Sequence, residues 1–211
     1  MEQNSIINFN EPLVPRYPKI QTKLVYAFKD GRPLTLDLIT PPLLPNVKAH
    51  FPLLIYVPDV DEHNMVKSDE RFAQMLEIAK RGYAVALISY RTNSDVTAMV
   101  KDIHSATRFL LDHAFKYKLD PYRYLLFGEG LGGYLSSLSI LEQGQQRSND
   151  EDVRRSPLRY KGGVLLETSL TPQPFSGPFL SELLLQNTQK LPPLLILNVT
   201  ADNTLTDKQA T

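Results

Sequence analysis

The sequence contains no cysteine among its 211 residues. Without thiols the chain can form no disulfide, no thiolate metal site and no cysteine nucleophile, so these three kinds of chemistry are excluded together. It also lacks an excess of charge, because Lys and Arg total 23 and Asp and Glu total 23. A neutral chain has no basic surface field, so we expect neither nucleic acid nor an anionic membrane as a partner.

Long apolar runs are missing as well. The stretch from Met1 to Ser5 has no basic residues followed by an apolar segment, and the other apolar runs are too short to cross a bilayer. We therefore expect a cytoplasmic protein without membrane contact. With 42% hydrophobic and 22% charged residues, the chain can bury one globular core. We place this single domain at residues 21–211, after an irregular, proline-bearing arm at residues 1–20.

The apolar pattern changes along the chain. Residues 23–26 and 34–39 flank Lys29-Asp30-Gly31-Arg32, which predicts an antiparallel hairpin at the edge of a sheet. From Pro52 onward, continuous apolar runs alternate with helical stretches, which is typical of parallel strands covered on both faces. The predicted parallel strands are 53–57, 84–89, 124–127, 163–166 and 194–197, and the predicted helices are 69–80, 94–117 with Ser94 or Asp95 as its N-cap, and a third after residue 130.

This order of elements predicts an α/β fold with a doubly wound, mostly parallel sheet and a ligand crevice beyond the carboxyl ends of the strands. Two segments interrupt the alternation. Residues 142–156 are polar and charged, and we interpret them as a solvated loop. Residues 171–190 predict a loop and a short amphipathic helix, which form either a small cap over the pocket or a helix packed on the sheet.

Six residues, Gly128-Glu129-Gly130-Leu131-Gly132-Gly133, which we call the glycine turn, stand between a predicted strand and a predicted helix. A strand, sharp turn and helix in this order form the nucleophile elbow G-x-S-x-G of the α/β-hydrolases, and here the serine position is Gly130. The turn also fits the dinucleotide motif G-x-G-x-x-G through Gly128, Gly130 and Gly133. We disfavour this alternative because the turn lies in mid-sheet and the next strand ends too early, at Glu167.

Other blocks accompany the turn: Arg81-Gly82-Tyr83, Arg108-Phe109-Leu110, Leu119-Asp120-Pro121 with Arg123, and Pro192 to Ile196 leading to Asp202. With these blocks in this order, the chain from Pro52 onward resembles the esterase/lipase branch of the α/β-hydrolases, which includes the feruloyl-esterase-like and hormone-sensitive-lipase-like enzymes. The resemblance implies the α/β-hydrolase fold, shortened at its C-terminus, and a family activity of carboxylic-ester hydrolysis.

The resemblance also implies a serine nucleophile, a histidine base, an acid and an oxyanion hole. Gly130 has no side chain that could attack a carbonyl, and the family's H-G-G stretch is replaced by Pro58-Asp59-Val60-Asp61. The backbone N–H of Leu131 is the oxyanion donor that remains, and Asp202 matches the acid position. No histidine follows Asp202 before Thr211, and the sequence leaves open whether the chain is naturally short or a fragment.

These losses predict an inactive or impaired esterase-like protein that binds a small acyl or carboxylate ligand, or a partner, in the remnant pocket. The alternative is an active ester hydrolase that uses unrecognised residues or a segment beyond Thr211. Three further residues, Asp59, Asp61 and His63, lie with Glu62 in a loop that faces the expected pocket. Their oxygen and imidazole groups could hold a divalent cation, but the spacing matches no established site, so we expect no metal and no cofactor.

Several polar residues near the turn have ordinary explanations. Glu129 adjoins the serine position and could act as an acid or base, although a hydrogen-bonded or solvated glutamate is the favoured interpretation. We expect Ser136, Ser137 and Ser139 to bond to the helix backbone or to water. His104 and His113 are expected at the surface or at a helix end, and the amides of Leu131 and Gly132 could bind a small anion. The sequence indicates no oligomeric state.

Overall fold

The computed structural model describes residues 17–42, 50–60, 71–92, 94–143, 156–168 and 191–198. The segment 171–190, most of the loop 142–156, and the first sixteen residues of the expected arm lie outside the described residues. Lys19 and Ile20 belong to the first strand, so the arm ends earlier than expected. Within the described part of the chain, no helix has the length and apolar character needed to cross a membrane.

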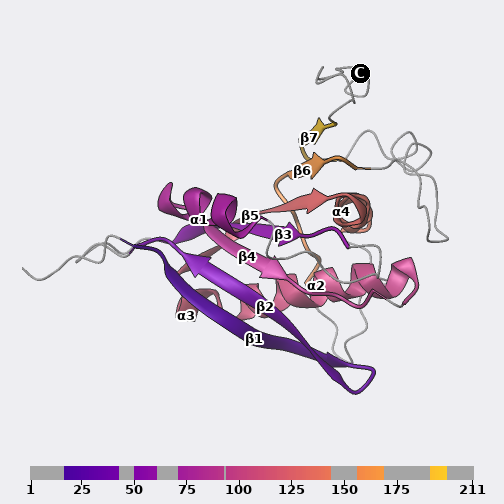
Figure 1. The fold of residues 1–211 in the computed structure, drawn as a ribbon, viewed down its shortest axis with the longest axis horizontal. Coiled ribbons are helices and arrows are strands. Elements are labelled where there is room, and N and C mark those ends of the chain that lie inside the picture. Colours follow the sequence, from indigo (N-terminus) through magenta and orange to yellow (C-terminus); the bar gives the residue numbers. More distant parts are fainter. Residues whose placement is uncertain are drawn as a thin grey trace, which may run out of the picture.

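A seven-stranded mixed sheet forms the centre of the molecule (Figure 1). Its strand order is β1-β2-β4-β3-β5-β6-β7. β1 pairs antiparallel with β2 at one edge, β2 pairs antiparallel with β4, and the remaining neighbours are parallel. The predicted edge hairpin and parallel sheet are thus confirmed. The strands are β1 Lys19–Lys29, β2 Arg32–Thr40, β3 Phe51–Val57, β4 Ala84–Ile88, β5 Leu119–Glu129, β6 Gly163–Leu166 and β7 Leu194–Leu197.

Helices cover both faces of this sheet, and one predicted helix is divided. The helices are α1 Phe72–Lys80, α2 Val96–Asp112, α3 Ala114–Tyr117 and α4 Leu131–Leu141. Asp95 is the N-cap of α2, since its Oδ1 accepts the Ala98 N–H at 2.7 Å. The single helix expected over 94–117 is interrupted at His113, whose ring Nδ1 lies 2.8 Å from the Phe109 carbonyl oxygen. α3 then ends at Lys118 in a left-handed conformation.

The alternation of side chains along each strand separates two cores. Leu53, Ile55 and Val57 of β3 belong to the larger cluster, which includes residues of α2 and α4. Leu54 and Tyr56 belong to the smaller cluster with Met75 and other residues around α1. Successive residues of a strand point to opposite faces, so a central strand buried on both faces is apolar throughout. This explains why the parallel strands are continuous apolar runs in the sequence.

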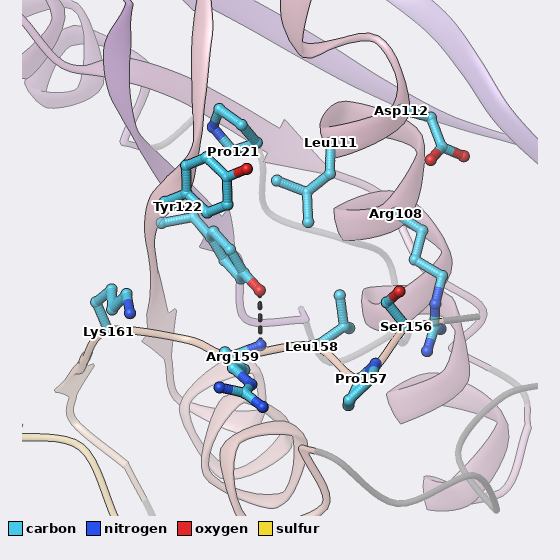
Figure 2. A pocket seen from close by; sticks show the side chains of 11 residues that line it. Arg108, Leu111, Asp112, Pro121, Tyr122, Ser156, Pro157, Leu158, Arg159 and Lys161 are labelled. Atoms are coloured by element: carbon cyan, nitrogen blue, oxygen red, sulfur yellow. Dashed lines mark hydrogen bonds between the residues drawn. The ribbon is translucent and has the colours of Figure 1, made fainter.

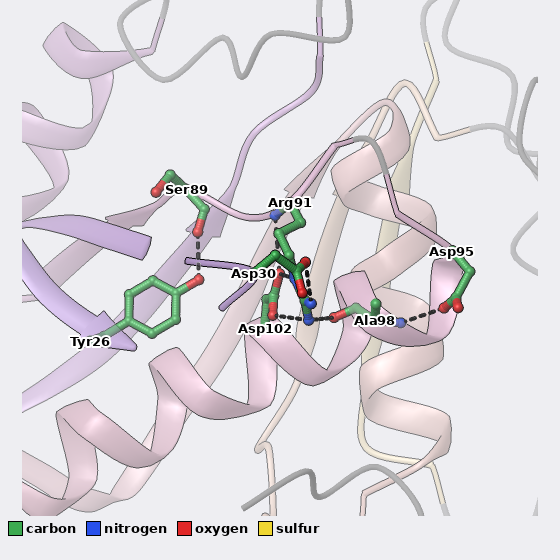
Figure 3. Close-up of polar contacts among 7 residues, drawn as sticks. All are labelled: Tyr26, Asp30, Ser89, Arg91, Asp95, Ala98 and Asp102. Atoms are coloured by element: carbon green, nitrogen blue, oxygen red, sulfur yellow. Dashed lines mark hydrogen bonds and ion pairs between the residues drawn. The ribbon is translucent and has the colours of Figure 1, made fainter. Parts of the chain in front are cut away.

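A cluster of polar residues connects the edge hairpin and α2 to the end of β4 through hydrogen bonds and ion pairs (Figure 3). The Arg91 Nε and backbone N–H donate to Asp102 Oδ2 at 2.9 and 3.0 Å, and Arg91 Nη2 pairs with Asp102 Oδ1 at 2.8 Å. Arg91 Nη1 reaches Asp30 at 3.0 Å, and Tyr26 Oη donates to the Ser89 carbonyl at 2.6 Å. The hydrogen bonds to buried Asp102 raise the pKa of the Arg91 guanidinium, which therefore keeps its positive charge.

Candidate functional site

The glycine turn connects the end of β5 to the start of α4. Gly130 has φ +54° and ψ −120°, a conformation that costs about 1 to 3 kcal/mol for a residue with a side chain. Its N–H donates to the Leu166 carbonyl of β6 at 3.0 Å, and the Gly133 N–H donates to the Gly130 carbonyl at 3.1 Å. The backbone therefore has the sharp strand-to-helix turn that an elbow requires, fixed by one hydrogen bond to β6 and one within the turn.

Close packing accounts for the glycines that follow. A Cβ on Gly132 would lie 2.1 Å from the Val57 carbonyl oxygen, and a Cβ on Gly133 would lie 1.9 Å from Thr168 Oγ1. No side chain fits at such distances, so glycine at 132 lets α4 approach the end of β3, and glycine at 133 lets it approach Thr168 beyond β6. The spacing that resembles a dinucleotide motif is therefore explained by helix–strand packing, without a phosphate ligand.

The carboxylate of Asp59 fills the place of the missing side chain at Gly130. Asp59 Oδ1 accepts the Leu131 N–H at 2.9 Å. A Cβ built on Gly130 would lie 2.3 Å from Asp59 Cγ and 2.4 and 2.5 Å from its two carboxylate oxygens. In an esterase this space holds the nucleophile, and the Leu131 N–H would face the developing oxyanion. Here both are taken by one negatively charged group of the protein itself.

A buried tyrosine forms a hydrogen bond to the segment that carries Asp59. Tyr90 Oη donates to the Pro58 carbonyl oxygen at 2.8 Å. Burial, and secondly the charge of Asp59, raise the pKa of Tyr90 well above its ordinary value, so the phenol keeps its proton. Pro58 and Asp59 are thus fixed between Tyr90 and α4.

Glu129 is bound on the other side of the turn by two residues that the sequence did not reveal. Tyr56 Oη donates to Glu129 Oε2 at 2.7 Å. Arg71 Nε lies 2.9 and 3.1 Å from the two carboxylate oxygens, and Arg71 Nη2 also pairs with Oε1. The bond to Glu129 raises the pKa of Arg71. Glu129 is therefore a buried carboxylate whose two oxygens are already occupied by hydrogen bonds from Tyr56 and Arg71, so it is not free to take a proton from a substrate or a water molecule.

Arg71→Gln is expected to lower the free energy of unfolding by about 1 to 2 kcal/mol, because it leaves the Glu129 carboxylate buried with less compensation. The expected loss of stability is small because the Arg71 side chain is 30% exposed, and solvent screens its charge. Urea denaturation followed by circular dichroism measures the change. Lys80→Gln is the matched control, since Lys80 pairs with the exposed Glu77, and we expect a change below about 0.5 kcal/mol. Equal effects in the two variants would contradict this role of Arg71.

The described histidines and helix serines offer no catalytic pair at the turn. His104 is buried, not at the surface as expected, and its Nε2 lies 3.3 Å from the Ser139 carbonyl oxygen. Ser139 is nine residues along α4 from Gly130, or about 13 Å. His113 is at a helix end as expected. Ser137 and Ser139 donate to the backbone carbonyls four residues earlier, and Ser136 is fully buried beneath the turn.

Three of the predicted site residues, Asp61, His63 and Asp202, lie outside the described residues. The loop considered for a divalent cation is therefore described only at Asp59. In the part of the chain that the structure describes, no three acidic or histidine side chains come together as metal ligands. Among the other predicted site residues, the structure brings Gly130, Leu131 and Asp59 into contact. Arg71 and Tyr56, 58 and 73 residues from Glu129, complete the surroundings of the turn.

Comparison with known proteins identifies relatives of this chain. Residues 36–162 match the sequence model of the BD-FAE family. The chain is 32% identical over 78 residues to the probable isoprenylcysteine alpha-carbonyl methylesterase ICMEL1 of Arabidopsis thaliana, which is 36% of this chain and 16% of that protein. It is 29% identical over 86 residues to the probable isoprenylcysteine alpha-carbonyl methylesterase ICME of Oryza sativa subsp. japonica, 40% of this chain and 21% of that protein. The match thus spans about a fifth of these curated relatives.

Solved structures show the same fold over most of the chain. A thermophilic esterase of Thermogutta terrifontis, Est2 with propionate bound, superposes with a TM-score of 0.67 at 20% identity, over 94% of this chain and 77% of the esterase. The same esterase phosphorylated by paraoxon gives a TM-score of 0.68 at 18% identity, over 90% and 73%. At these identities the likeness establishes the α/β-hydrolase fold expected from the sequence.

Proposed function

Because the chain belongs to the BD-FAE family of esterase-like α/β-hydrolases, we propose that it has kept the esterase fold and lost ester hydrolysis. In this proposal the region around the glycine turn binds a small acyl ligand, or a partner, without cleaving it. A cytoplasmic location, and the absence of nucleic acid and membrane partners, stay predictions from the sequence.

The position of Asp59 carries the proposal. Its carboxylate lies against Gly130 and accepts the Leu131 N–H. A substrate carbonyl would need that N–H for its developing negative charge, and each lost oxyanion donor costs roughly 3 to 4 kcal/mol of transition-state stabilisation. A fixed negative charge at the same point makes the cost larger. Gly130 also supplies no nucleophile, whose removal in triad enzymes reduces turnover by about 10⁶-fold.

The same carboxylate narrows the choice of ligand. Part of the sequence-based proposal was a carboxylate ligand on the amides of α4. Asp59 already occupies the Leu131 N–H with a carboxylate, and a second anion there would meet like-charge repulsion. A neutral acyl group is therefore the better candidate at this site.

The alternative function is ester hydrolysis by other residues, and the retained backbone of the turn is the observation that favours it. Gly130 keeps an elbow conformation, so a nucleophile and base supplied from elsewhere could still meet a substrate there. Asp202, at the family's acid position, is the sequence-predicted residue on which such activity would depend.

Hydrolysis of p-nitrophenyl acetate and butyrate separates the two functions. We expect wild-type protein to release p-nitrophenol at the rate of buffer, because neither nucleophile nor free oxyanion donor is present at the glycine turn. Asp59→Asn should remain inactive, since removing the charge supplies no nucleophile. Turnover clearly above buffer in the wild type, and its loss in Asp202→Ala, would overturn the proposal and establish the alternative.

A further inference from the structure

A cavity of about 800 Å³ lies between α2, the start of β5 and residues 156–161 (Figure 2). Tyr124 of its lining is four residues along β5 from Gly128, the first residue of the glycine turn, so the cavity is about 13 Å from that turn. It is therefore separate from the site described above. We call it the α2–β5 cavity. Its volume is in the range of pockets that hold small organic molecules.

The walls of the α2–β5 cavity are held together by hydrogen bonds. The Arg159 N–H donates to Tyr124 Oη at 2.6 Å, and the Lys161 N–H donates to the Tyr124 carbonyl at 2.8 Å. Behind them, Tyr160 Oη and Thr107 Oγ1 lie 2.9 Å apart. The segment 156–161 is thus fixed to β5 and α2. A cavity with such walls is preformed, which lowers the entropic cost of binding.

Arg108 is the unusual residue of this lining. It is 8% exposed, and its Nε has no hydrogen-bond partner. Among the described residues, no carboxylate forms an ion pair with it. Figure 2 shows its side chain extending from α2 toward Ser156 and Pro157, away from the Asp112 carboxylate. A buried cation with an unsatisfied donor is costly unless an anion joins it.

The rest of the lining combines further positive charge with apolar surface. Arg159 and Lys161 add two cations at the exposed side, against one carboxylate, Asp112, in the described lining. Leu111, Leu158 and the ring of Tyr122 supply apolar surface beside them. The arrangement suits a molecule with an anionic group at one end and an apolar body at the other.

We propose that the α2–β5 cavity binds a small organic anion with an apolar body, such as a medium-chain carboxylate. The anionic group pairs with the Arg108 guanidinium, and the apolar body lies against Leu111 and Tyr122. This site is independent of the function proposed for the glycine turn, because it shares no residue with it.

Isothermal titration of the full chain with octanoate tests the proposal, with 1-octanol as the neutral analogue and inorganic phosphate as the anion without a body. We expect octanoate to bind at least about tenfold more tightly than either, because octanol lacks the anionic group and phosphate lacks the apolar body. Arg108→Gln should weaken octanoate binding by about tenfold or more. The same variant should unfold at an equal or higher temperature than wild type, because it removes a buried guanidinium that has no carboxylate partner among the described residues.

Two further variants test binding at the α2–β5 cavity without affecting folding or the glycine turn. Tyr122 is 78% exposed, so Tyr122→Ala should fold normally and still weaken octanoate binding severalfold. Arg123→Gln, the matched control, removes a neighbouring exposed arginine that pairs with Asp120 outside the lining and should bind octanoate as wild type does. Four results would each overturn the proposal. Arg108→Gln could bind octanoate as tightly as wild type does, or wild type could bind octanol as tightly as octanoate. Wild type could also bind phosphate more tightly than octanoate, or fail to bind octanoate at about 10 mM.

Discussion

Asp102→Ala is expected to lower the free energy of unfolding by about 3 kcal/mol, which for a chain of this size is a fall in Tm of about 6–12 °C. Asp102 is fully buried and receives three hydrogen bonds from Arg91. Without the carboxylate, the Arg91 Nε and backbone N–H lose their acceptor at the junction of β4 and α2, and Nη2 loses its shorter hydrogen bond. Urea denaturation followed by circular dichroism measures the loss.

Asp30→Asn is the matched control, because Asp30 pairs with the same arginine and its φ of +51° is a conformation that asparagine tolerates. Its side chain is 70% exposed, and it meets Arg91 through a single contact of 3.0 Å. We expect a change of at most about 0.5 kcal/mol, as for other exposed ion pairs. If the two aspartate variants were equally stable, burial would not be what gives Asp102 its importance.

Gly130→Ser is expected to destabilise the chain by more than about 2 kcal/mol and to leave it inactive toward p-nitrophenyl esters. The backbone conformation at residue 130 is strained for any residue with a Cβ, and the new Cβ would also clash with the Asp59 carboxylate. The serine has no described histidine beside it to take its proton. Thermal denaturation and an ester assay measure the two effects, and esterase activity in this variant would reveal a base that the structure does not identify.

A double-mutant cycle separates the collision from the strain. Asp59→Ala removes the colliding atoms, so Gly130→Ser should cost less in that background, with a coupling of at least about 1 kcal/mol. Gly31→Ser is the control for strain alone, because Gly31 has φ +73° and no atom within 4 Å of a built Cβ. It should cost about 1 kcal/mol. Additive effects of the Asp59 and Gly130 changes would show that the two positions do not compete for the same space.

Much of the fold could be predicted from local pattern. The central strands are short continuous apolar runs because both faces of the sheet are covered, and β6 and β7 have the predicted bounds. The prediction of β5 was too short, since this strand was expected over 124–127 and is observed as Leu119–Glu129. Its first half contains a register shift opposite Phe51 and Leu53, and Asp120 accepts the Tyr122 N–H there. The first half of β5 therefore has a sequence typical of a turn, and this is why the strand was predicted to begin only at residue 124.

The candidate site was predictable in its parts but not in its assembly. Gly130, Leu131, Asp59 and Glu129 were all identified, because each stands at or near the end of a predicted strand. Arg71 and Tyr56 left no signal, since a long-range ion pair follows no sequence period. His104 was placed at the surface because a single polar residue on an amphipathic helix is usually exposed, whereas α4 packs over it.

The sequence by itself determined the family, the order of the strands and helices, and the absence of a serine at residue 130. These follow from short-range features: apolar periodicity, glycine spacing and residue identity. Only the tertiary structure decided that Asp59 takes the Leu131 N–H and the space beside Gly130. It also decided that Arg108 is buried beside the α2–β5 cavity, where its Nε has no hydrogen-bond partner among the described residues. Both depend on which side chains meet after distant segments pack, and that is set by the three-dimensional arrangement of β3, β5, α2 and α4.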